Sequence, residues 1–552
     1  MSADIVIRGG TVVDGSGAPG RRADVAITGD RISGIGPGLK GEQELDAGGQ
    51  VVAPGFIDIH THYDAQVFWD PSLTPSSFHG VTSVVAGNCG FSIAPTRPEH
   101  HETIARTLEN VEDMNVASLA AGIPWDFETF PEYLDSIRRR GTVLNFTAYV
   151  GHTALRLFVM GDEAYERAAK PEEVERMCRV VHEGIEAGAP GFATSLAPTH
   201  RGVDGKPIPS RFAERDEIEA LCLAVGGTGR GVCHFAPGEA YGIKDLYELQ
   251  PRVGVPFTYG ALLTFPGDRY RKQVEINDQG WARGSQVWPQ VTPRPVTMQI
   301  TMADPFVLNL GRYFGDLMKE SRPAREAAYR DPQWRARAAE DLERQVMKPR
   351  WETYRVDESE RFPELEGRKV SEIAQERGCE PLDVMCELAL EEDLKTRFRV
   401  YIANDDTEGV DYLLTREHVV LGLSDAGAHV GQLCDAPMPT DLLGNWVRER
   451  GTLPLETAIR KLTGEPADLF GFVGRGYLRE GGFADVAVID PETVHPGPVR
   501  RVRDFPGDAD RLTADRPAGV THVLVNGVPI RRDGEPVHEG QEARPGVVPE
   551  IA

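Results

Sequence analysis

The chain has 552 residues, 40% of them hydrophobic and 26% charged, which is the composition of a globular protein and excludes a disordered or fibrous one. Its formal net charge of −25 opposes the approach of a phosphate backbone, so we expect no nucleic-acid partner. A chain of this length has room for roughly three or four domain-sized units.

Neither a targeting segment nor a membrane anchor is readable in the sequence. The start, Met-Ser-Ala-Asp-Ile, lacks a basic segment followed by an apolar run, and no stretch approaches the roughly 18 apolar residues of a membrane helix. The 7 cysteines are odd in number and show no paired spacing, so a disulfide framework is not expected. We therefore expect a cytoplasmic protein without a membrane partner, whose thiols are free to act as metal ligands.

Both ends of the chain are predicted to be rich in β-structure. Short apolar runs separated by glycine-containing turns predict strands near the N-terminus at Ile5–Arg8, Thr11–Val13 and Val25–Thr28. The same pattern of short apolar runs recurs near the C-terminus, at Ala484–Asp490 and Thr521–Ile530. We expect residues 1–54 and 476–552 to pair with each other in one small β-sandwich domain.

Between these ends, apolar strand-like runs alternate with helical stretches, which is typical of an α/β fold with a parallel sheet buried on both faces. Seven runs are predicted strands: Phe56–His62, Thr82–Ala86, Val143–Val150, Gly191–Ser195, Gly231–His234, Pro256–Leu262 and Val419–Asp425. Two more, Gln286–Val291 and Arg399–Asn404, compete for one further place. We predict a TIM-like (β/α)₈ barrel over residues 55–475, with a helical insertion at about 300–395 where Arg, Glu and Ala are frequent.

The pair His60 and His62 lies at the end of the stretch Pro54-Gly-Phe-Ile-Asp-Ile-His-Thr-His62. Side chains two residues apart in a strand share one face, so both imidazoles are predicted to face the barrel axis, at the strand end where such barrels carry their active sites. Two neutral imidazoles on one face suit zinc or a similar cation. The alternative is a pair of surface or capping histidines.

Several stretches together resemble the amidohydrolase superfamily over nearly the whole chain. They are Ile-Arg-Gly-Gly-Thr-Val-Val-Asp-Gly at residues 7–15, Val-Val-Ala-Pro-Gly-Phe-Ile-Asp-Ile-His-Thr-His at 51–62, and Gly-Phe-Ala-Asp-Val-Ala-Val-Ile-Asp at 482–490. Within that superfamily, Gly87–Gly90, Gly151–Arg156 and Leu423–Asp425 are similar to the N-acyl-D-amino-acid deacylase branch, the D-aminoacylase-like enzymes. The resemblance implies a metal-dependent barrel enzyme.

This resemblance implies roles for three more residues. Cys89, in a Gly-Asn-Cys-Gly turn, matches a thiolate that bridges two metal positions; its alternative is a small buried hydrophobe. His234, at the end of Gly-Val-Cys-His, matches a third histidine ligand, or else is a satisfied core residue. Asp425 matches a metal-bound or metal-adjacent carboxylate that takes a proton from the attacking water and passes it to the leaving nitrogen; a buried capping aspartate is the alternative.

Five residues are weaker candidates for substrate contact: His152, Arg156, His200, Tyr259 and His429. The deacylases place a further histidine ligand on the strand that corresponds to Val255–Leu263, and this chain has no histidine there. Either the site holds a single ion, or Tyr259, His200 or His429 completes a second position.

A second departure follows Asp425, where the family pattern supplies an arginine for the substrate carboxylate. Here the segment reads Asp425-Ala-Gly-Ala-His-Val-Gly-Gln-Leu-Cys-Asp435, and the next arginine is Arg448. A bidentate clamp on a carboxylate needs a guanidinium at a fixed place, so a free N-acyl-D-amino acid is put in doubt unless Arg156 or Arg201 substitutes.

These features predict a hydrolase that cleaves the C–N bond of a small-molecule amide. The substrate predicted first is an N-acyl-D-amino acid or a related N-acyl amine. The cofactor is expected to be one or two zinc ions, or another divalent transition metal. A hydantoinase-like or dihydropyrimidinase-like hydrolase of cyclic amides is the alternative within enzymes. A non-catalytic assembly protein of the same fold is the alternative outside them, and a homo-oligomer is compatible with either.

Overall fold

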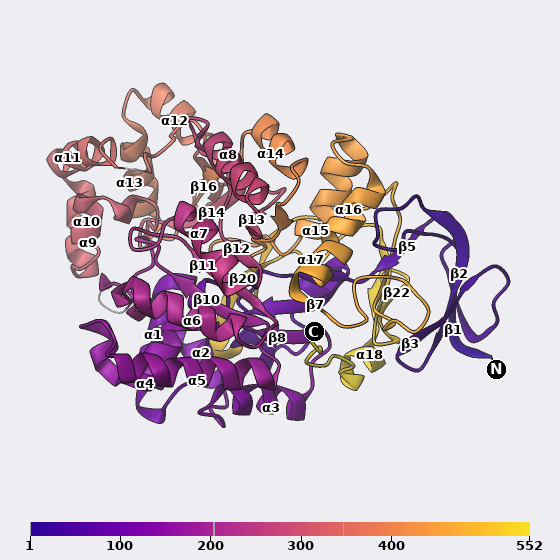
Figure 1. Ribbon diagram of the computed structural model, residues 1–552. Coiled ribbons are helices and arrows are strands. Elements are labelled where there is room, and N and C mark those ends of the chain that lie inside the picture. Colours follow the sequence, from indigo (N-terminus) through magenta and orange to yellow (C-terminus); the bar gives the residue numbers. More distant parts are fainter. Residues whose placement is uncertain (1, 203–204, 346) are drawn as a thin grey trace. The chain divides into compact units, whose positions relative to one another are not determined.

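The computed structural model describes residues 2–202, 205–345 and 347–552 (Figure 1). It divides into two compact units. The first comprises Met1–Arg294, Asp406–Val430 and Cys434–Ala552, and the second comprises Pro295–Asp405 and Gly431–Leu433. Strands and helices are both abundant, so the predicted α/β class is confirmed, and each unit is described separately below.

The two ends of the chain share one sheet in the first unit. Its strands run in the order β23-β22-β21-β18-β5-β1-β2-β3, with β4 paired to β1. The bounds are β1 Ala3–Val12, β2 Arg21–Thr28, β3 Arg31–Gly36, β4 Gly41–Asp46, β5 Val51–Pro54, β18 Val486–Ile489, β21 Val520–Val525, β22 Val528–Arg532 and β23 Glu535–Pro536. The N- and C-terminal segments meet where β5 pairs antiparallel with β18, with Val52 opposite Val488. A separate hairpin joins β19 Arg500–Phe505 to β20 Ala509–Thr513.

Parallel strands form the centre of the first unit, in the sheets β6-β7-β8 and β17-β13-β12-β11-β10-β9. Their bounds are β6 Phe56–Asp58, β7 Val81–Ala86, β8 Asn145–Ala148, β9 Val150–Gly151, β10 Gly191–Ser195, β11 Val232–Ala236, β12 Phe257–Tyr259, β13 Val287–Val291 and β17 Val420–Leu421. Two backbone hydrogen bonds link the sheets: His62 N donates to Ala426 O at 2.7 Å, and Tyr149 N donates to Ala86 O at 3.0 Å. Of the two competing runs, Gln286–Val291 therefore supplies a parallel strand, β13.

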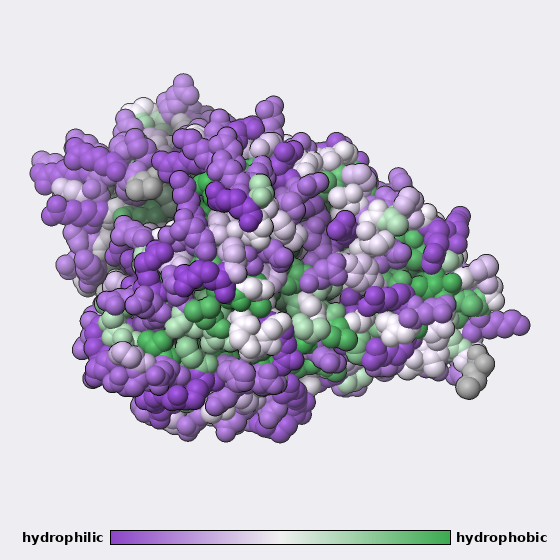
Figure 2. Space-filling model, viewed as in Figure 1, coloured by the Kyte–Doolittle hydropathy of each residue, from purple (hydrophilic) through white to green (hydrophobic). Residues whose placement is uncertain are grey.

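Amphipathic helices follow these strands. The helix α5 (Pro171–Ala187) begins with proline and two glutamates, which suit the first turn of a helix, and ends at Gly188 in the left-handed conformation. It buries Met177, Val181 and Ile185 on one face, and the region of α3, α4 and α5 has a mainly hydrophilic outer surface (Figure 2). The other helices of the unit are α1 His101–Glu112, α2 Val116–Gly122, α3 Phe130–Arg140, α4 His152–Met160, α6 Arg215–Gly226, α7 Ile243–Val253, α8 Arg269–Ala282, α14 Thr407–Leu414, α15 Met438–Asp441, α16 Leu455–Leu462, α17 Gly464–Phe470 and α18 His538–Ala543.

The second unit has a core and a sheet of its own. Its antiparallel strands run in the order β14 (Val296–Thr301), β16 (Arg397–Ala403) and β15 (Arg355–Glu358). The run Arg399–Asn404 thus overlaps a strand of this sheet, and the segment around 300–395 contains strands as well as the predicted helices. The helices are α9 Arg312–Leu317, α10 Arg322–Arg330, α11 Pro332–Leu342, α12 Val370–Arg377 and α13 Pro381–Glu391. Large side chains such as Phe314, Tyr329 and Phe398 fill its core.

Among the described residues, no helix is both long enough and apolar enough to cross a bilayer.

A buried ion pair joins the sheet built from the chain ends to the parallel strands. Arg475 and Asp485 are 3% and 5% exposed, and their side chains contact each other. Asp485 also accepts hydrogen bonds from Asn145 Nδ2 at 3.0 Å and from the backbone N–H of Asn526 at 2.8 Å. The carboxylate therefore depends on the guanidinium for its charge balance, because a buried charge without a partner is costly.

We expect the substitution Arg475→Ala to destabilise the first unit by about 3–5 kcal/mol, because Asp485 would stay buried without its cation. Thermal unfolding followed by circular dichroism measures the shift. The control is Arg503→Ala, since Arg503 and its partner Asp508 are 67% and 80% exposed and such surface pairs contribute little. Equal unfolding temperatures for the two variants would show that the buried pair does not stabilise the fold.

Candidate metal centre

The backbone just after β6 fixes the positions of His60 and His62. The N–H of His60 donates to Asp58 Oδ1 at 3.2 Å, and the N–H of His62 is held by the carbonyl of Ala426. Both imidazoles are almost fully buried, and their ring centroids lie 5.4 Å apart. The alternation of side chains along an extended segment thus delivers two nitrogen donors to one side of the chain.

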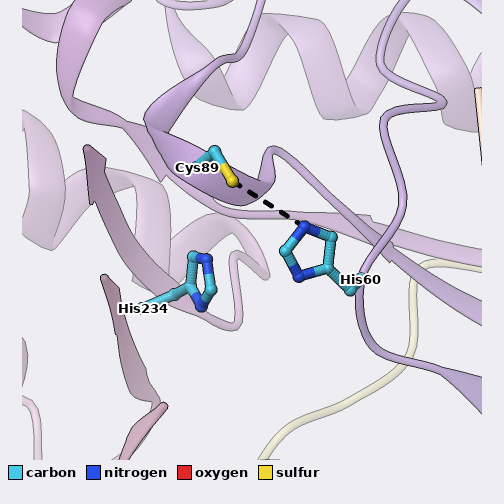
Figure 3. A group of neighbouring side chains, drawn as sticks. All are labelled: His60, Cys89 and His234. Carbon is cyan, nitrogen blue, oxygen red and sulfur yellow. Dashed lines mark hydrogen bonds between the residues drawn. The ribbon is translucent and has the colours of Figure 1, made fainter. Parts of the chain in front are cut away.

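A tight turn after β7 brings Cys89 to the same place. Gly87 has a φ of +74°, and a Cβ at this position would lie 2.7 Å from the carbonyl oxygen of Tyr149, so glycine is required. The N–H of Gly87 donates to Asp64 Oδ2 at 2.9 Å, which holds the turn. As a result the Cys89 Sγ lies 3.7 Å from His60 Nε2 (Figure 3).

His234 and Asp425 complete the group. His234, on β11, points toward His60 with its ring centroid 5.2 Å away (Figure 3). Asp425, after β17, places Oδ1 3.1 Å from His60 Nε2 and 3.8 Å from His62 Nε2, and its side chain is 30% exposed. Two sets of three donors result, each with its donor atoms within 4.8 Å of one another: His60, Cys89 and His234, and His60, His62 and Asp425.

The electrostatics of these donors suit a divalent cation. Burial raises the pKa of Asp425, but the hydrogen bonds and charges of His60 and His62 outweigh it and hold that pKa well below its usual range. The pKa of the Cys89 thiol is also lowered, because these two histidines outweigh its desolvation. Burial and the same two charges hold the pKa of His234 well below its usual range, so this imidazole is neutral. Ionised carboxylate, thiolate and neutral imidazole are the forms that bind zinc. Burial lowers the pKa of His60 and His62, but Asp425, Cys89 and, for His62, Glu112 outweigh it and raise both values, so a bound ion displaces the protons of these two rings.

One buried atom indicates that the site receives a further group. His234 Nε2 is buried and has no hydrogen-bond partner among the described residues. A buried polar atom without a partner costs free energy, so its presence beside a thiol and two histidines is explained by a ligand. The donors present therefore fit a zinc ion or a similar transition metal, which His60, His62, Cys89, His234 and Asp425 surround.

Three further residues contact the outer side of the histidine rings, and no sequence motif marks them. Gln290 Oε1 is hydrogen-bonded to His60 Nδ1, Thr258 Oγ1 lies 2.9 Å from His234 Nδ1, and Glu112 Oε1 lies 3.3 Å from His62 Nδ1. The hydrogen bonds at Nδ1 orient the rings of His60 and His234 so that Nε2 points to the centre. Glu112 forms an ion pair with His62 without a hydrogen bond to its Nδ1. The sequence offers one indication for Gln290, because it is a polar residue in the otherwise apolar run of β13. It offers none for Glu112, on α1.

His200 and His429 lie beside the centre. His200 Nδ1 is 2.6 Å from Ser195 Oγ, and its ring packs against Phe91 at 5.2 Å. Burial and the neighbouring imidazoles of His429 and His62 lower the pKa of His200 to about 3. His429 Nε2 lies 3.8 Å from Glu112 Oε2, which places it next to the partner of His62. Their contact with a substrate stays a prediction.

Two more of the predicted substrate residues, His152 and Arg156, are engaged elsewhere. Both nitrogens of His152 are bonded, to Thr194 Oγ1 at 2.8 Å and to Glu217 Oε1 at 2.9 Å. Arg156 is fully buried and pairs with the same Glu217 carboxylate. The structure therefore brings neither of them into the donor group.

Tyr259 belongs to the opposite face of β12 from the donor group. Its neighbour Thr258 contacts His234, and adjacent side chains of a strand point to opposite faces. Tyr259 is therefore directed away from the place where a further ligand is needed. The substrate-binding roles of His152, Arg156 and Tyr259 remain predictions.

We expect Gln290→Leu to weaken zinc binding by about 10–100-fold, because the outer partner that orients His60 is lost. The matched control is Gln250→Leu: Gln250 is also a buried glutamine, but its hydrogen bonds go to Val255 O and Gln286 N. Competition with a chromophoric chelator gives the dissociation constants of both variants. If Gln290→Leu binds zinc as tightly as the control, Gln290 does not position His60.

A family model and a related sequence both relate this chain to amidohydrolases. The amidohydrolase family model matches residues 43–531. The chain is 30% identical to the D-aminoacylase of Alcaligenes xylosoxydans xylosoxydans, over 98% of this chain and 96% of that protein.

Two solved structures are similar over nearly their full length. One is a D-aminoacylase with a binuclear metal centre, described by one-metal activation and second-metal attenuation (26% identity, TM-score 0.68, 99% of this chain and 100% of that chain). The other is the N-acyl-D-glutamate deacylase of Bordetella bronchiseptica with zinc and a phosphonate inhibitor (26% identity, TM-score 0.66, 97% and 99%). The resemblance seen in the sequence is confirmed: the chain belongs to the amidohydrolase family, in its D-aminoacylase-like branch.

Proposed function

We propose that this amidohydrolase removes the acyl group from an N-acyl-D-amino acid or a related N-acyl amine by hydrolysis of the amide bond. The observation that carries the proposal is the position of Asp425, a partly exposed carboxylate 3.1 Å from His60 Nε2, within a group of zinc-type donors. The relatives named above are deacylases of N-acyl-D-amino acids, which supports the substrate class.

The residues divide the chemistry between them. When bound, the divalent ion lowers the pKa of a water molecule and polarises the amide carbonyl. Asp425 is ionised, so its carboxylate can accept a proton from the attacking water and then donate it to the leaving nitrogen. Its partial exposure gives this carboxylate access to solvent and substrate, whereas the histidines that hold it are buried.

The group that recognises a substrate carboxylate is not an arginine of the segment 425–435, which contains none. The nearby Arg294 is occupied, because its Nε lies 2.7 Å from Asp435 and its Nη1 lies 3.3 Å from Asp441. We therefore assign recognition of the substrate carboxylate to the imidazoles of His200 and His429. An N-acyl amine without a carboxylate is also compatible with a site that has only these imidazoles for contact.

We also propose that the parallel strands close into a barrel and that the chain ends form a separate domain. With Asn145–Gly151 counted as one strand, the parallel strands of the first unit number eight among the described residues, and we assign them to one closed (β/α)₈ barrel. The hydrogen bonds of His62 and Tyr149 between the two sheets support closure. We keep residues 1–54 and 476–552 as the sandwich-like domain and 55–475 as the barrel with its insertion. The 7 unpaired thiols favour the cytoplasm.

The variant Asp425→Asn should lose at least about 100-fold in kcat, because the amide cannot act as the base. Release of amine from a panel of N-acyl-D-, N-acyl-L- and cyclic amides provides the measurement, with Asp508→Asn, an exposed site, as the control. Unchanged kcat in Asp425→Asn would remove Asp425 from the mechanism. Turnover of cyclic amides alone would move the enzyme to the hydantoinase class.

Removal of the metal should abolish turnover reversibly. We expect dialysis against a chelator to yield folded protein without activity, and zinc, cobalt or manganese to restore it, because Asp425 alone is a weak catalyst of amide hydrolysis. Metal analysis before and after dialysis accompanies the assay. Full turnover by metal-free protein would contradict the proposal.

A further inference from the structure

The loop that follows β17 belongs to both compact units. Its residues 425–430 are part of the first unit, Gly431–Leu433 are part of the second, and the chain from Cys434 onward is part of the first again. The rest of the second unit comes from the single stretch Pro295–Asp405. Three residues of the loop that begins at the proposed base Asp425 are therefore built into a unit that supplies none of the metal-centre donors.

The backbone of this loop is strained where it carries functional side chains. Asp425 has a φ of +43° and His429 a φ of +49°, in the left-handed region that residues with a Cβ rarely adopt. Gly427, between them, has a φ of +92°, and a Cβ there would lie 2.8 Å from the carbonyl oxygen of His62. Such a backbone persists only where surrounding contacts hold it. The position of Asp425 thus depends on the anchors of the loop.

The first part of the loop is anchored within the first unit by backbone hydrogen bonds. The pairs, with the donor first, are His62 N with Ala426 O at 2.7 Å, His429 N with Glu112 O, and Leu512 N with Val430 O at 2.6 Å. These bonds fix the loop as far as Val430. The next anchors along the chain lie in the second unit.

The second unit holds Gly431–Leu433 by a hydrogen bond and by core packing. β14 is an edge strand of its sheet, and Gln299 N on this strand donates to Gln432 O at 2.7 Å. Leu433 is 6% exposed and belongs to the hydrophobic core of the unit, which also contains Met298 and Ile300 of β14. Burial of a leucine side chain generally stabilises more than one backbone hydrogen bond does, so Leu433 is the stronger of these two anchors.

The chain is held again directly after Leu433. Arg294 Nε lies 2.7 Å from Asp435 Oδ1, and Asp435 is 5% exposed. Leu433 therefore lies between two fixed points of the first unit, Val430 and Asp435. Without the Leu433 anchor, the strained backbone before it can relax toward ordinary φ values, and this relaxation moves the side chains of His429 and Asp425.

We propose that Leu433 is a positioning residue, which holds Asp425 and His429 in place for amide hydrolysis by anchoring their loop in the core of the second unit. The insertion then acts on the site through the chain itself, because each contact named above lies within one unit and the loop joins them. This deepens the proposed function and rests on it, since Asp425 and His429 have the roles given there.

The first test follows the loop and requires no substrate. In Leu433→Ala, the amide hydrogens of Ala428 and His429, which donate to Asp425 O and Glu112 O, should exchange at least about 10-fold faster than in the wild type. The matched control is Leu317→Ala, because Leu317 is 7% exposed in the same core but belongs to α9. Hydrogen exchange measured by mass spectrometry, on peptides that span residues 425–430, reports both variants.

Two results of this exchange experiment would overturn the proposal. One is unchanged exchange in Leu433→Ala, which would show that the loop does not depend on this side chain. The other is equal acceleration in Leu317→Ala, which would show that any loss of core packing in the second unit opens the loop.

The second test measures turnover. In Leu433→Ala, kcat for the best amide should fall by about 10–100-fold, because a displaced base no longer meets the attacking water in the right geometry. Leu317→Ala should keep a kcat close to wild type, and Leu433→Met, which conserves volume, should recover most of the loss. An equal fall in Leu433→Ala and Leu317→Ala would assign the effect to stability and contradict the positioning role.

Smaller truncations keep both tests within folded protein. Leu433→Val and Leu317→Val remove one methylene each, cost less stability than the alanine variants and should show the same contrast with smaller changes. If the wild type hydrolyses no amide, the proposed function fails, whereas hydrogen exchange still decides whether Leu433 anchors the loop. If exchange rises in the Leu433 variants while kcat stays at the wild-type value, the positioning role is wrong.

Discussion

His60 has one lone pair to offer to the centre of the site, because Gln290 already engages its other nitrogen. Cys89 and Asp425 both approach that same Nε2, from a turn and from a loop that lie far apart in the sequence. An ion bound at the centre would therefore meet His60 Nε2 beside the thiol of Cys89 and the carboxylate of Asp425. The rest of the site can be understood as the means of orienting that single ring and its neighbours.

The fold supplies this orientation through the ends of parallel strands. β6, β7, β11 and β17 each end just before or at a donor, so donors from distant segments meet at one edge of the strands. Local devices then set each side chain: Gly87 permits the turn that presents Cys89, and Asp64 holds it. The outer contacts of Glu112, Thr258 and Gln290 direct the imidazoles inward, and because these three are buried they are difficult to displace.

The sequence predicted most strands of the parallel sheets because long apolar runs followed by polar residues are a strong local signal. It could not decide between Gln286–Val291 and Arg399–Asn404, since both runs have strand character and only their partners differ: one pairs in parallel with β12 and β17, the other antiparallel with β14 and β15. His60, His62 and Cys89 were found because their motifs are local. Glu112 and Gln290 were not, because their roles arise only from contacts across the fold. For the same reason, the sequence could show that the Val255–Leu263 segment lacks a histidine but not that Tyr259 is directed away from the donors.

The central claim is that a divalent ion binds among the donors His60, His62, Cys89, His234 and Asp425. Anomalous diffraction at the zinc absorption edge, from crystals of the zinc-loaded protein without substrate, tests it most directly. We expect a strong peak among these donors, at about 2.0–2.1 Å from the histidine nitrogens that bind the ion. Zinc-loaded crystals without a peak at this group would contradict the claim.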